Sequence, residues 1–180
     1  MRVALIGTHR VGKTSLLEAL AEQYPTYEYY QEPYFELQER GYAFSSPPTF
    51  DEFIMQADFA RKQIENSHPN AFFDRSPLDL LAYAAAVDEG ESIPDEFETM
   101  RHAMTQIDLI VFVSIEKPDR VPCLVSEMPE LREKVHKILS NWILEYSTKT
   151  LFVQGSMPER LHQISEAMTL GNIDFAAQNR

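Results

Sequence analysis

The chain has 180 residues, of which 44% are hydrophobic and 24% charged, a size and composition typical of one globular domain with a full core. The formal net charge of −12 argues against non-specific binding to nucleic acid or to an anionic membrane, because both require a basic face. The one cysteine, Cys123, cannot form an internal disulfide. The first apolar run begins almost at Met1, so no room is expected for a signal peptide. No apolar run approaches the length of a membrane span, and we expect a cytoplasmic protein.

The first predicted strand, Val3 to Ile6, leads into a glycine-containing loop and then a predicted helix. Residues 7–14, GTHRVGKT, fit the phosphate-binding pattern G-x-x-x-x-G-K-[ST] in the strand-loop-helix setting that this pattern requires. The two glycines allow the tight turn, and successive backbone amides would face phosphate oxygens. The expected nucleotide contacts are Gly7, Thr8, His9, Arg10, Val11, Gly12, Lys13, Thr14 and Ser15.

Three side chains of this loop have distinct predicted places. Lys13 can reach the β- and γ-phosphates, and the Thr14 hydroxyl can ligate Mg²⁺. The ring of backbone amides that would bind phosphate, called the cradle below, requires only the amide of His9. The imidazole of His9 is therefore expected to face solvent. The expected ligand is ATP with Mg²⁺.

The middle of the chain alternates short apolar runs with helical patterns. Residues 27–30 predict a second strand. Thr49 and Glu52 form a capping box that opens a helix, and apolar residues then recur at helical spacing. Residues 71–73 predict a third strand, and Ser76 precedes a proline that would begin the next helix.

The acidic segment from Asp88 to Glu98 is expected to be a solvated connection between two helices. The remaining predicted elements follow in order: a buried strand at 109–113, a helix from Leu131 to Tyr146, a strand at 151–153 and a helix capped by Ser156 with Glu159.

Strands separated by helices predict a three-layer α/β/α sandwich with a five-stranded, mostly parallel sheet, the P-loop NTPase fold. Residues 1–170 are expected to form a single nucleotide-binding domain, and residues 171–180 a loose C-terminal tail. Ligands of such sheets bind beyond the carboxyl ends of the strands. The loop at 7–14, Glu32 and Asp74–Arg75 should therefore converge.

Two carboxylates at that edge have open alternatives. Asp74 follows three apolar residues, where a P-loop protein places the carboxylate that holds Mg²⁺, usually through a water. Otherwise it would pair with Arg75 in a structural ion pair. Glu32 could accept the proton of a phosphoryl acceptor, or it could be a solvated carboxylate at a strand end.

Together the loop at 7–14, Glu32–Pro33 and Asp74–Arg75–Ser76 resemble the P-loop small-molecule kinases. The resemblance is to deoxynucleoside kinases and to the nicotinamide riboside kinase-like group of AAA-type ATP-binding proteins. It spans residue 1 to about residue 170. The strings FFDRSPLDLLAY, at residues 72–83, and PDR, at 118–120, resemble the latter group.

This resemblance implies roles for individual residues. Glu32 would be the general base or would hold the acceptor hydroxyl. Arg75 would contact the acceptor or the transferred phosphoryl group, and Asp74 would lie in the water shell of Mg²⁺. Gly155 and Ser156 would lie beside the nucleobase of ATP.

One departure concerns the lid that such kinases close over the phosphates with several arginines. The corresponding segment, residues 116–133, offers only Lys117, Arg120 and Arg132. Either Arg120 or Arg132 would supply the missing charge, or transfer would be slow. Arg120 is the catalytic candidate of this segment.

The expected function is ATP-dependent transfer of the γ-phosphoryl group to a small-molecule acceptor, a nucleoside or nucleotide-like compound. The alternative is an ATP-binding regulatory protein or a weak ATPase without an acceptor. Aromatic residues could line a pocket for a flat base, although helical spacing favours the core for most of them: Tyr34, Phe35, Phe50, Phe53 and Phe59. Similar nucleoside kinases are often dimers, which leaves a homodimer open.

The GTPase class is disfavoured because the chain has neither an Asn-Lys-x-Asp nor an Asp-x-x-Gly segment. A hexameric remodelling ATPase is disfavoured because no second helical domain follows the predicted sheet.

Overall fold

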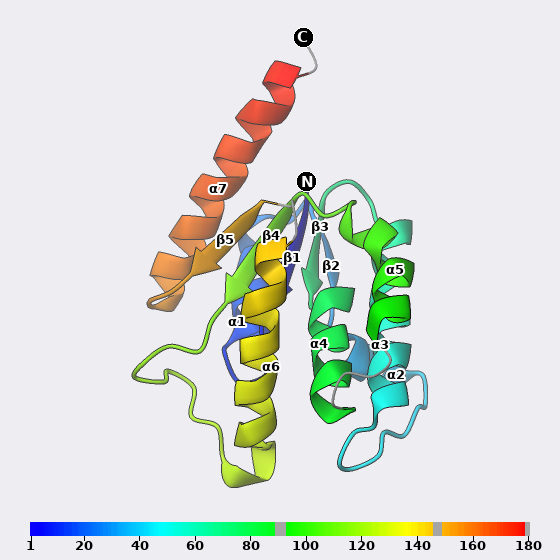
Figure 1. Cartoon of the computed structure of the whole chain (residues 1–180). Coiled ribbons are helices and arrows are strands. Elements are labelled where there is room, and N and C mark those ends of the chain that lie inside the picture. The colour runs from blue at the N-terminus through cyan, green and yellow to red at the C-terminus, as the bar shows by residue number, and fades with distance from the viewer. Residues whose placement is uncertain (89–92, 146–148, 179–180) are drawn as a thin grey trace.

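The computed structural model describes the backbone of residues 1–88, 93–145 and 149–178. Five strands form one sheet in the order β2-β3-β1-β4-β5, and every neighbouring pair is parallel (Figure 1). The strands are β1 (Arg2–Ile6), β2 (Glu28–Tyr30), β3 (Ala71–Asp74), β4 (Leu109–Val113) and β5 (Thr150–Val153). The helices are α1 (Lys13–Gln23), α2 (Pro33–Glu39), α3 (Phe50–Asn66), α4 (Pro77–Val87), α5 (Ile93–Met104), α6 (Pro129–Trp142) and α7 (Met157–Gln178).

The central strand β1 contributes to both faces of the sheet. Val3 and Leu5 pack in a core with α1 and α7, whereas Ala4 and Ile6 pack in a second core with α3, α4 and α6. Side chains alternate along a strand, so each helix layer covers one set of residues. The three-layer sandwich expected from the sequence is confirmed (Figure 1).

Local signals fix the starts of α3 and α4. The Glu52 backbone N–H donates to the Thr49 hydroxyl, and the Thr49 N–H donates to the Glu52 carboxylate, so the predicted capping box of α3 is present. Ser76 caps α4, whose first residue is Pro77. These helices start where the sequence places them because each start depends on neighbouring residues alone.

The expected connection from Asp88 to Glu98 is wrong in its second part, because α5 begins at Ile93. Met100, Ala103 and Met104 are buried in the core on the α3 and α4 side of the sheet. The density of acidic residues in the sequence obscured this apolar spacing, which decides the helix.

The C-terminal part also differs from expectation. Residues 171–178, expected as a loose tail, continue the helix α7 to Gln178. The helix expected to reach Tyr146 ends at Trp142, followed by a single 3₁₀ turn at Ile143–Glu145, and Tyr146 lies outside the described residues. Among the described helices, none is long and apolar enough to cross a membrane.

Candidate nucleotide and acceptor site

Three separate segments meet at the carboxyl edge of the sheet. The Thr14 hydroxyl donates to Asp74 Oδ2 at 2.7 Å, and the Arg75 guanidinium donates to the Gly7 carbonyl at 3.2 Å and to Glu32 Oε1 at 2.5 Å. The strand order explains this meeting, because β3 lies between β1 and β2. The residues that the sequence predicted to converge therefore lie within hydrogen-bonding distance of one another.

The loop between β1 and α1 has the conformation of an open turn lined by amides. Gly7 has φ 144°, and a Cβ there would lie 2.4 Å from the Val113 carbonyl oxygen, so only glycine fits. The Gly7 N–H donates to the fully buried Asp79 at 2.7 Å. Among the described residues, the amides of Arg10 to Lys13 have no hydrogen-bond acceptor in the protein. These free donors could bind phosphate oxygens.

Lys13 is buried at the start of α1, and its ammonium donates to the Thr8 carbonyl across the loop at 2.8 Å. Burial, with a contribution from the nearby Arg75 cation, lowers the pKa of Lys13 to about 8. The side chain is therefore aimed across the amide cradle and is ready to gain an anionic partner.

Asp74 at the end of β3 has one satisfied and one free carboxylate oxygen. Oδ2 accepts the Thr14 hydroxyl, whereas the buried Oδ1 has no hydrogen-bond partner among the described residues. Burial raises the pKa of this carboxyl group. A free buried oxygen beside a threonine hydroxyl is a donor set that suits Mg²⁺. The alternative ion pair between Asp74 and Arg75 is not found in the described part of the chain.

Arg75 occupies a strained backbone position directly after β3. Its φ of 88° lies in the left-handed region, which a non-glycine residue adopts only when its surroundings enforce it. The buried guanidinium pairs with Glu32, lies 3.9 Å from Asp79 and sits 5.1 Å from the centre of the Tyr83 ring. These contacts hold the cation at the mouth of the loop.

Glu32 lies between β2 and α2 and is not the solvated carboxylate of the alternative interpretation. Burial alone would raise its pKa, but the Arg75 and Lys13 cations outweigh burial and hold the pKa of Glu32 below its usual value. The carboxylate is therefore ionised at neutral pH.

A cavity of about 150 Å³ adjoins this ion pair. Its polar wall contains His9, Glu32 and Arg75, and its other walls contain aromatic side chains. Of the five aromatic residues considered from the sequence, Tyr34 and Phe53 line this cavity. The arrangement places a carboxylate and a guanidinium at one end of a largely apolar pocket.

The expectation that the His9 imidazole faces solvent is wrong. Its Nδ1 lies 2.7 Å from the Tyr83 hydroxyl and its Nε2 lies 2.6 Å from the Glu127 carbonyl oxygen. A carbonyl only accepts, so this geometry assigns the proton to Nε2 and makes Tyr83 the donor to Nδ1. Burial lowers the pKa of His9 to about 4, which keeps the ring neutral. Sequence reasoning missed Tyr83, whose only signal was its place two turns into the helix after Ser76.

Three arginines of the C-terminal half differ in their relation to the loop. Arg120, the candidate of the lid segment, has a side chain 49% exposed and pairs with Glu116 at 2.5 Å, so the structure does not bring it to the loop. Arg132 and Arg160 are buried and donate to loop carbonyls. Arg160 was not considered from the sequence, because nothing local connects it to a loop 149 residues earlier.

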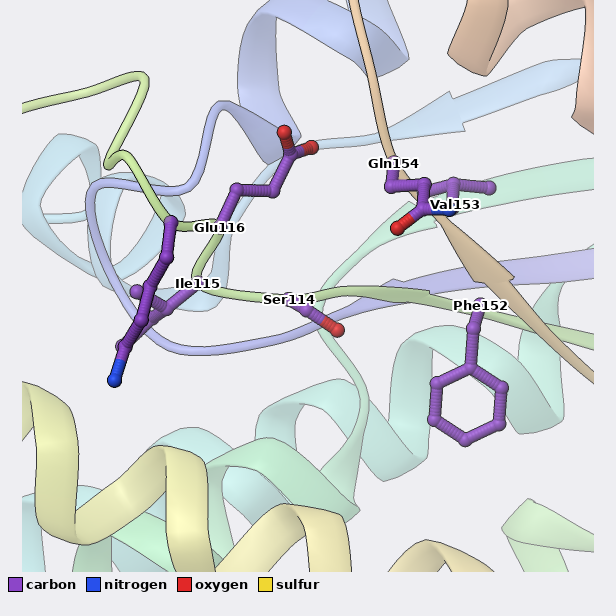
Figure 2. A pocket seen from close by; sticks show the side chains of 7 residues that line it. Ser114, Ile115, Glu116, Phe152, Val153 and Gln154 are labelled. Atoms are coloured by element: carbon purple, nitrogen blue, oxygen red, sulfur yellow. The ribbon is translucent and has the colours of Figure 1, made fainter.

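Gly155 lies where the chain leaves β5. It has φ 98°, and its N–H donates to Glu116 at 2.8 Å. A groove of about 470 Å³ lies beside it between the ends of β4 and β5 (Figure 2). In this view Glu116 and Phe152 point in opposite directions. Gly155 is thus tied to the segment after β4, next to a space large enough for a small ligand.

Known proteins share this fold. The deoxyadenosine kinase of M. mycoides with bound dCTP is 17% identical with a TM-score of 0.66, and the match covers 94% of this chain and 99% of that one. The NadR protein in complex with NR is 18% identical with a TM-score of 0.66, covering 93% of this chain and 50% of NadR. Thymidylate kinase from Candida albicans is 13% identical with a TM-score of 0.60, covering 95% and 92%. These likenesses establish the fold.

Comparison with curated protein sequences found no match. A family model described as an AAA domain matches residues 2–160, which include the loop at residues 7–14 and all five strands. The fold is that of the P-loop kinases, and the chain belongs to this AAA domain family.

Proposed function

We propose that the protein is an ATP-dependent kinase that transfers the γ-phosphoryl group to a small-molecule acceptor, a nucleoside or nucleotide-like compound. The observation that carries this proposal is the Glu32–Arg75 ion pair, which joins the phosphate-binding loop to a cavity of about 150 Å³. A protein that only binds ATP has no need of a buried carboxylate at such a place. The solved structures of similar fold include a deoxyadenosine kinase and NadR bound to NR, which supports an acceptor of this chemical class.

Both backbone amides and side chains would bind the nucleotide. The free amides of Arg10 to Lys13 would bind phosphate oxygens, and the Lys13 ammonium would offset charge on the β- and γ-phosphates. Thr14 and Asp74 would hold Mg²⁺, which supplies further positive charge to the phosphates when bound. Gly155 is proposed to lie near the nucleobase.

The acceptor half would operate through Glu32. The ionised carboxylate accepts the proton of the acceptor hydroxyl while the hydroxyl oxygen attacks the γ-phosphorus. The bond between the γ-phosphorus and the bridging oxygen breaks, and ADP leaves with that oxygen. Arg75 orients this carboxylate and offsets charge at the transferring group. The neutral His9 ring forms part of the cavity wall and takes no proton in this scheme.

Arg120 would join this site only if its segment moved, because Glu116 now holds it. Lys13 and Arg75 are therefore the proposed source of positive charge at the γ-phosphate. The same observation favours the second candidate, an ATP-binding regulator or weak ATPase, since a lid without free arginines excludes water poorly.

The proposed partner is a small molecule, without nucleic acid or membrane, because a net charge of −12 opposes both. The cytoplasm is the proposed compartment, residues 1–170 are proposed to act as one domain, and a homodimer is left to measurement.

The test measures ADP release from Mg-ATP with and without nucleosides, nucleoside monophosphates and pyridine ribosides. We expect one class of acceptor to stimulate ADP release. Glu32→Gln should lose this stimulation while it keeps affinity for Mg-ADP, because the carboxylate lies on the acceptor side of the loop. Slow release that no acceptor stimulates would contradict the kinase and support the regulator.

A further inference from the structure

Two buried arginines hold three consecutive carbonyl groups of the phosphate-binding loop. Arg132 Nε donates to the His9 oxygen at 3.0 Å, and Arg132 Nη2 donates to the Arg10 oxygen at 2.9 Å. Arg160 Nη1 donates to the Val11 oxygen at 2.9 Å. The two residues are 4% and 5% exposed, respectively. The three peptide bonds between residues 9 and 12 therefore each have their carbonyl oxygen fixed by an arginine, on the side away from the amides that would bind phosphate.

The direction of these oxygens determines the direction of the amides. A peptide unit is planar and trans, so the N–H of one residue points opposite to the C=O of the residue before it. Holding the carbonyls of residues 9, 10 and 11 thus turns the N–H groups of residues 10, 11 and 12 the other way. Among the described residues these three amides have no acceptor, as expected of donors kept for a ligand.

Each arginine is anchored from its far side by a carboxylate from the segment between β4 and α6. Arg132 makes a two-pronged pair with Asp119 at 2.5 and 3.1 Å, and Arg160 Nη2 donates to Glu116 at 2.7 Å. With its donors committed to two carbonyls and one carboxylate, the Arg132 guanidinium is not aimed at a phosphate. This geometry argues against Arg132 as the missing arginine of a lid.

We propose that Arg132 and Arg160 are positioning residues that orient the loop amides toward the phosphates without touching the nucleotide. This inference rests on the proposed function only where it concerns turnover; its affinity test needs nucleotide binding alone. Without either arginine, buried carbonyls would lose their donors and the peptide planes could rotate. The cradle would then no longer be fixed before the ligand arrives.

The first test compares affinity for Mg-ADP by calorimetry in Arg132→Ala, Arg160→Ala and the wild type. We expect each variant to bind at least about tenfold more weakly, since a lost hydrogen bond to a buried group has that order of effect. Affinity for inorganic tripolyphosphate should fall in parallel, because both ligands use the same amides. If turnover is observed, the KM for ATP should rise while the KM for the acceptor stays unchanged.

Two control variants separate positioning from general loss of stability. Leu139→Ala removes a buried side chain of α6 away from the loop, and Arg101→Gln breaks an exposed pair with Glu98 on α5. Both should bind Mg-ADP like the wild type, although the first should melt at a lower temperature. Weakened binding in Leu139→Ala at a temperature where it is folded would overturn the inference.

Lysine replacements provide a second readout that a merely structural role would not produce. Arg160 contacts one loop carbonyl, so Arg160→Lys should regain most of the affinity, whereas Arg132 spans two carbonyls and one carboxylate, so Arg132→Lys should not. If the alanine variants do not fold, these two lysine variants and Asp119→Asn, which loosens Arg132, decide the question. Wild-type affinity in all three would overturn the inference. Wild-type protein that binds Mg-ADP but turns over no acceptor would contradict the kinase proposal. The comparison of Mg-ADP affinities between the arginine variants and the wild type would still test the positioning role.

Discussion

At the scale of single residues, the lowered pKa of Lys13 predicts that ligand binding is coupled to proton uptake. Its pKa of about 8 means that part of the protein population carries a neutral Lys13 side chain near that pH. An anionic phosphate favours the charged form and raises the pKa, so binding takes up a proton. We expect net proton uptake when Mg-ADP binds near pH 8, and weaker binding as the pH rises further. Calorimetry in buffers of different ionisation enthalpy would measure the uptake, and a binding heat independent of the buffer would contradict it.

Gly7 gives a second prediction at this scale. Gly7→Ala forces a Cβ to within 2.4 Å of the Val113 carbonyl oxygen at φ 144°. We expect the free energy of unfolding to fall by about 1–3 kcal/mol or more, from backbone strain and displacement of β4. Gly41→Ala is a matched control, because φ there is also positive, at 92°, but nothing lies within 4 Å of the added Cβ. Urea denaturation should show a clearly larger loss for Gly7, and equal losses would contradict the clash.

Contacts at the residue scale also mark where sequence reasoning stops. The loop pattern and the strand ends predicted Lys13, Thr14 and Asp74, because a local motif or a strand boundary places each of them. Tyr83 and Arg160 were not predicted, since they reach the loop across 74 and 149 residues of chain. A contact of that kind depends on the packing of α4 and α7 and leaves no local pattern.

At the scale of secondary structure, the capped start of α3 lies close to the cavity beside Glu32 and Arg75. It contributes Phe53 and Gln56 to the cavity wall, and its first turn is held by Thr49 and Glu52. Thr49→Ala should reduce the free energy of unfolding by about 1 kcal/mol. The loosened turn should also raise the KM for the acceptor, whereas affinity for Mg-ADP should not change, because Thr49 and Glu52 make no hydrogen bond to the loop at residues 7–14 in the described part of the chain. Equal effects on both ligands would contradict a local role, and Thr105→Ala, in the turn directly after α5, is a control outside both sites.

Elements with strong local signals were predicted, and elements supported by tertiary packing were not. The five strands and the capped starts of α3 and α4 follow from apolar runs and capping residues. The helix α2 has only seven residues, too few to be stable alone, and it packs against α3. The charges around α5 obscured its apolar face. Short or highly charged helices thus depend on neighbours that the sequence does not place.

At the scale of the whole molecule, the parallel sheet explains why distant residues form one site. Its order brings the ends of β1, β2 and β3 together, which the alternation of strands and helices predicted in outline. The contacts of the segment between β4 and α6 were not predictable, because its acidic residues pair with four arginines that lie far apart in the sequence: Arg10, Arg120, Arg132 and Arg160. Two carboxylates of that segment pair with the arginines that donate to the loop, whereas the resemblance to kinases implied a lid over the phosphates.

Ligand binding should stabilise the whole fold, because the loop that would bind the ligand is formed only in the folded chain. A ligand at about 100 times its Kd adds about 2.7 kcal/mol to the free energy of unfolding. For a chain of this size that corresponds to a rise in Tm of roughly 5–10 °C. We expect Mg-ADP to produce this rise in the wild type, as measured by calorimetric or fluorescence-monitored melting.

Lys13→Ala should abolish the rise in Tm, since it removes the buried ammonium beside the loop. Phe152→Ala is the control and should keep the rise, because the Phe152 side chain lies in the groove between β4 and β5 and points away from Glu116 (Figure 2). If the rise survives in Lys13→Ala, the nucleotide binds elsewhere, and the loop between β1 and α1 is a structural turn. If it is lost in Phe152→Ala as well, Phe152 itself contributes to nucleotide binding, and the nucleobase extends past Gly155 into the groove between β4 and β5.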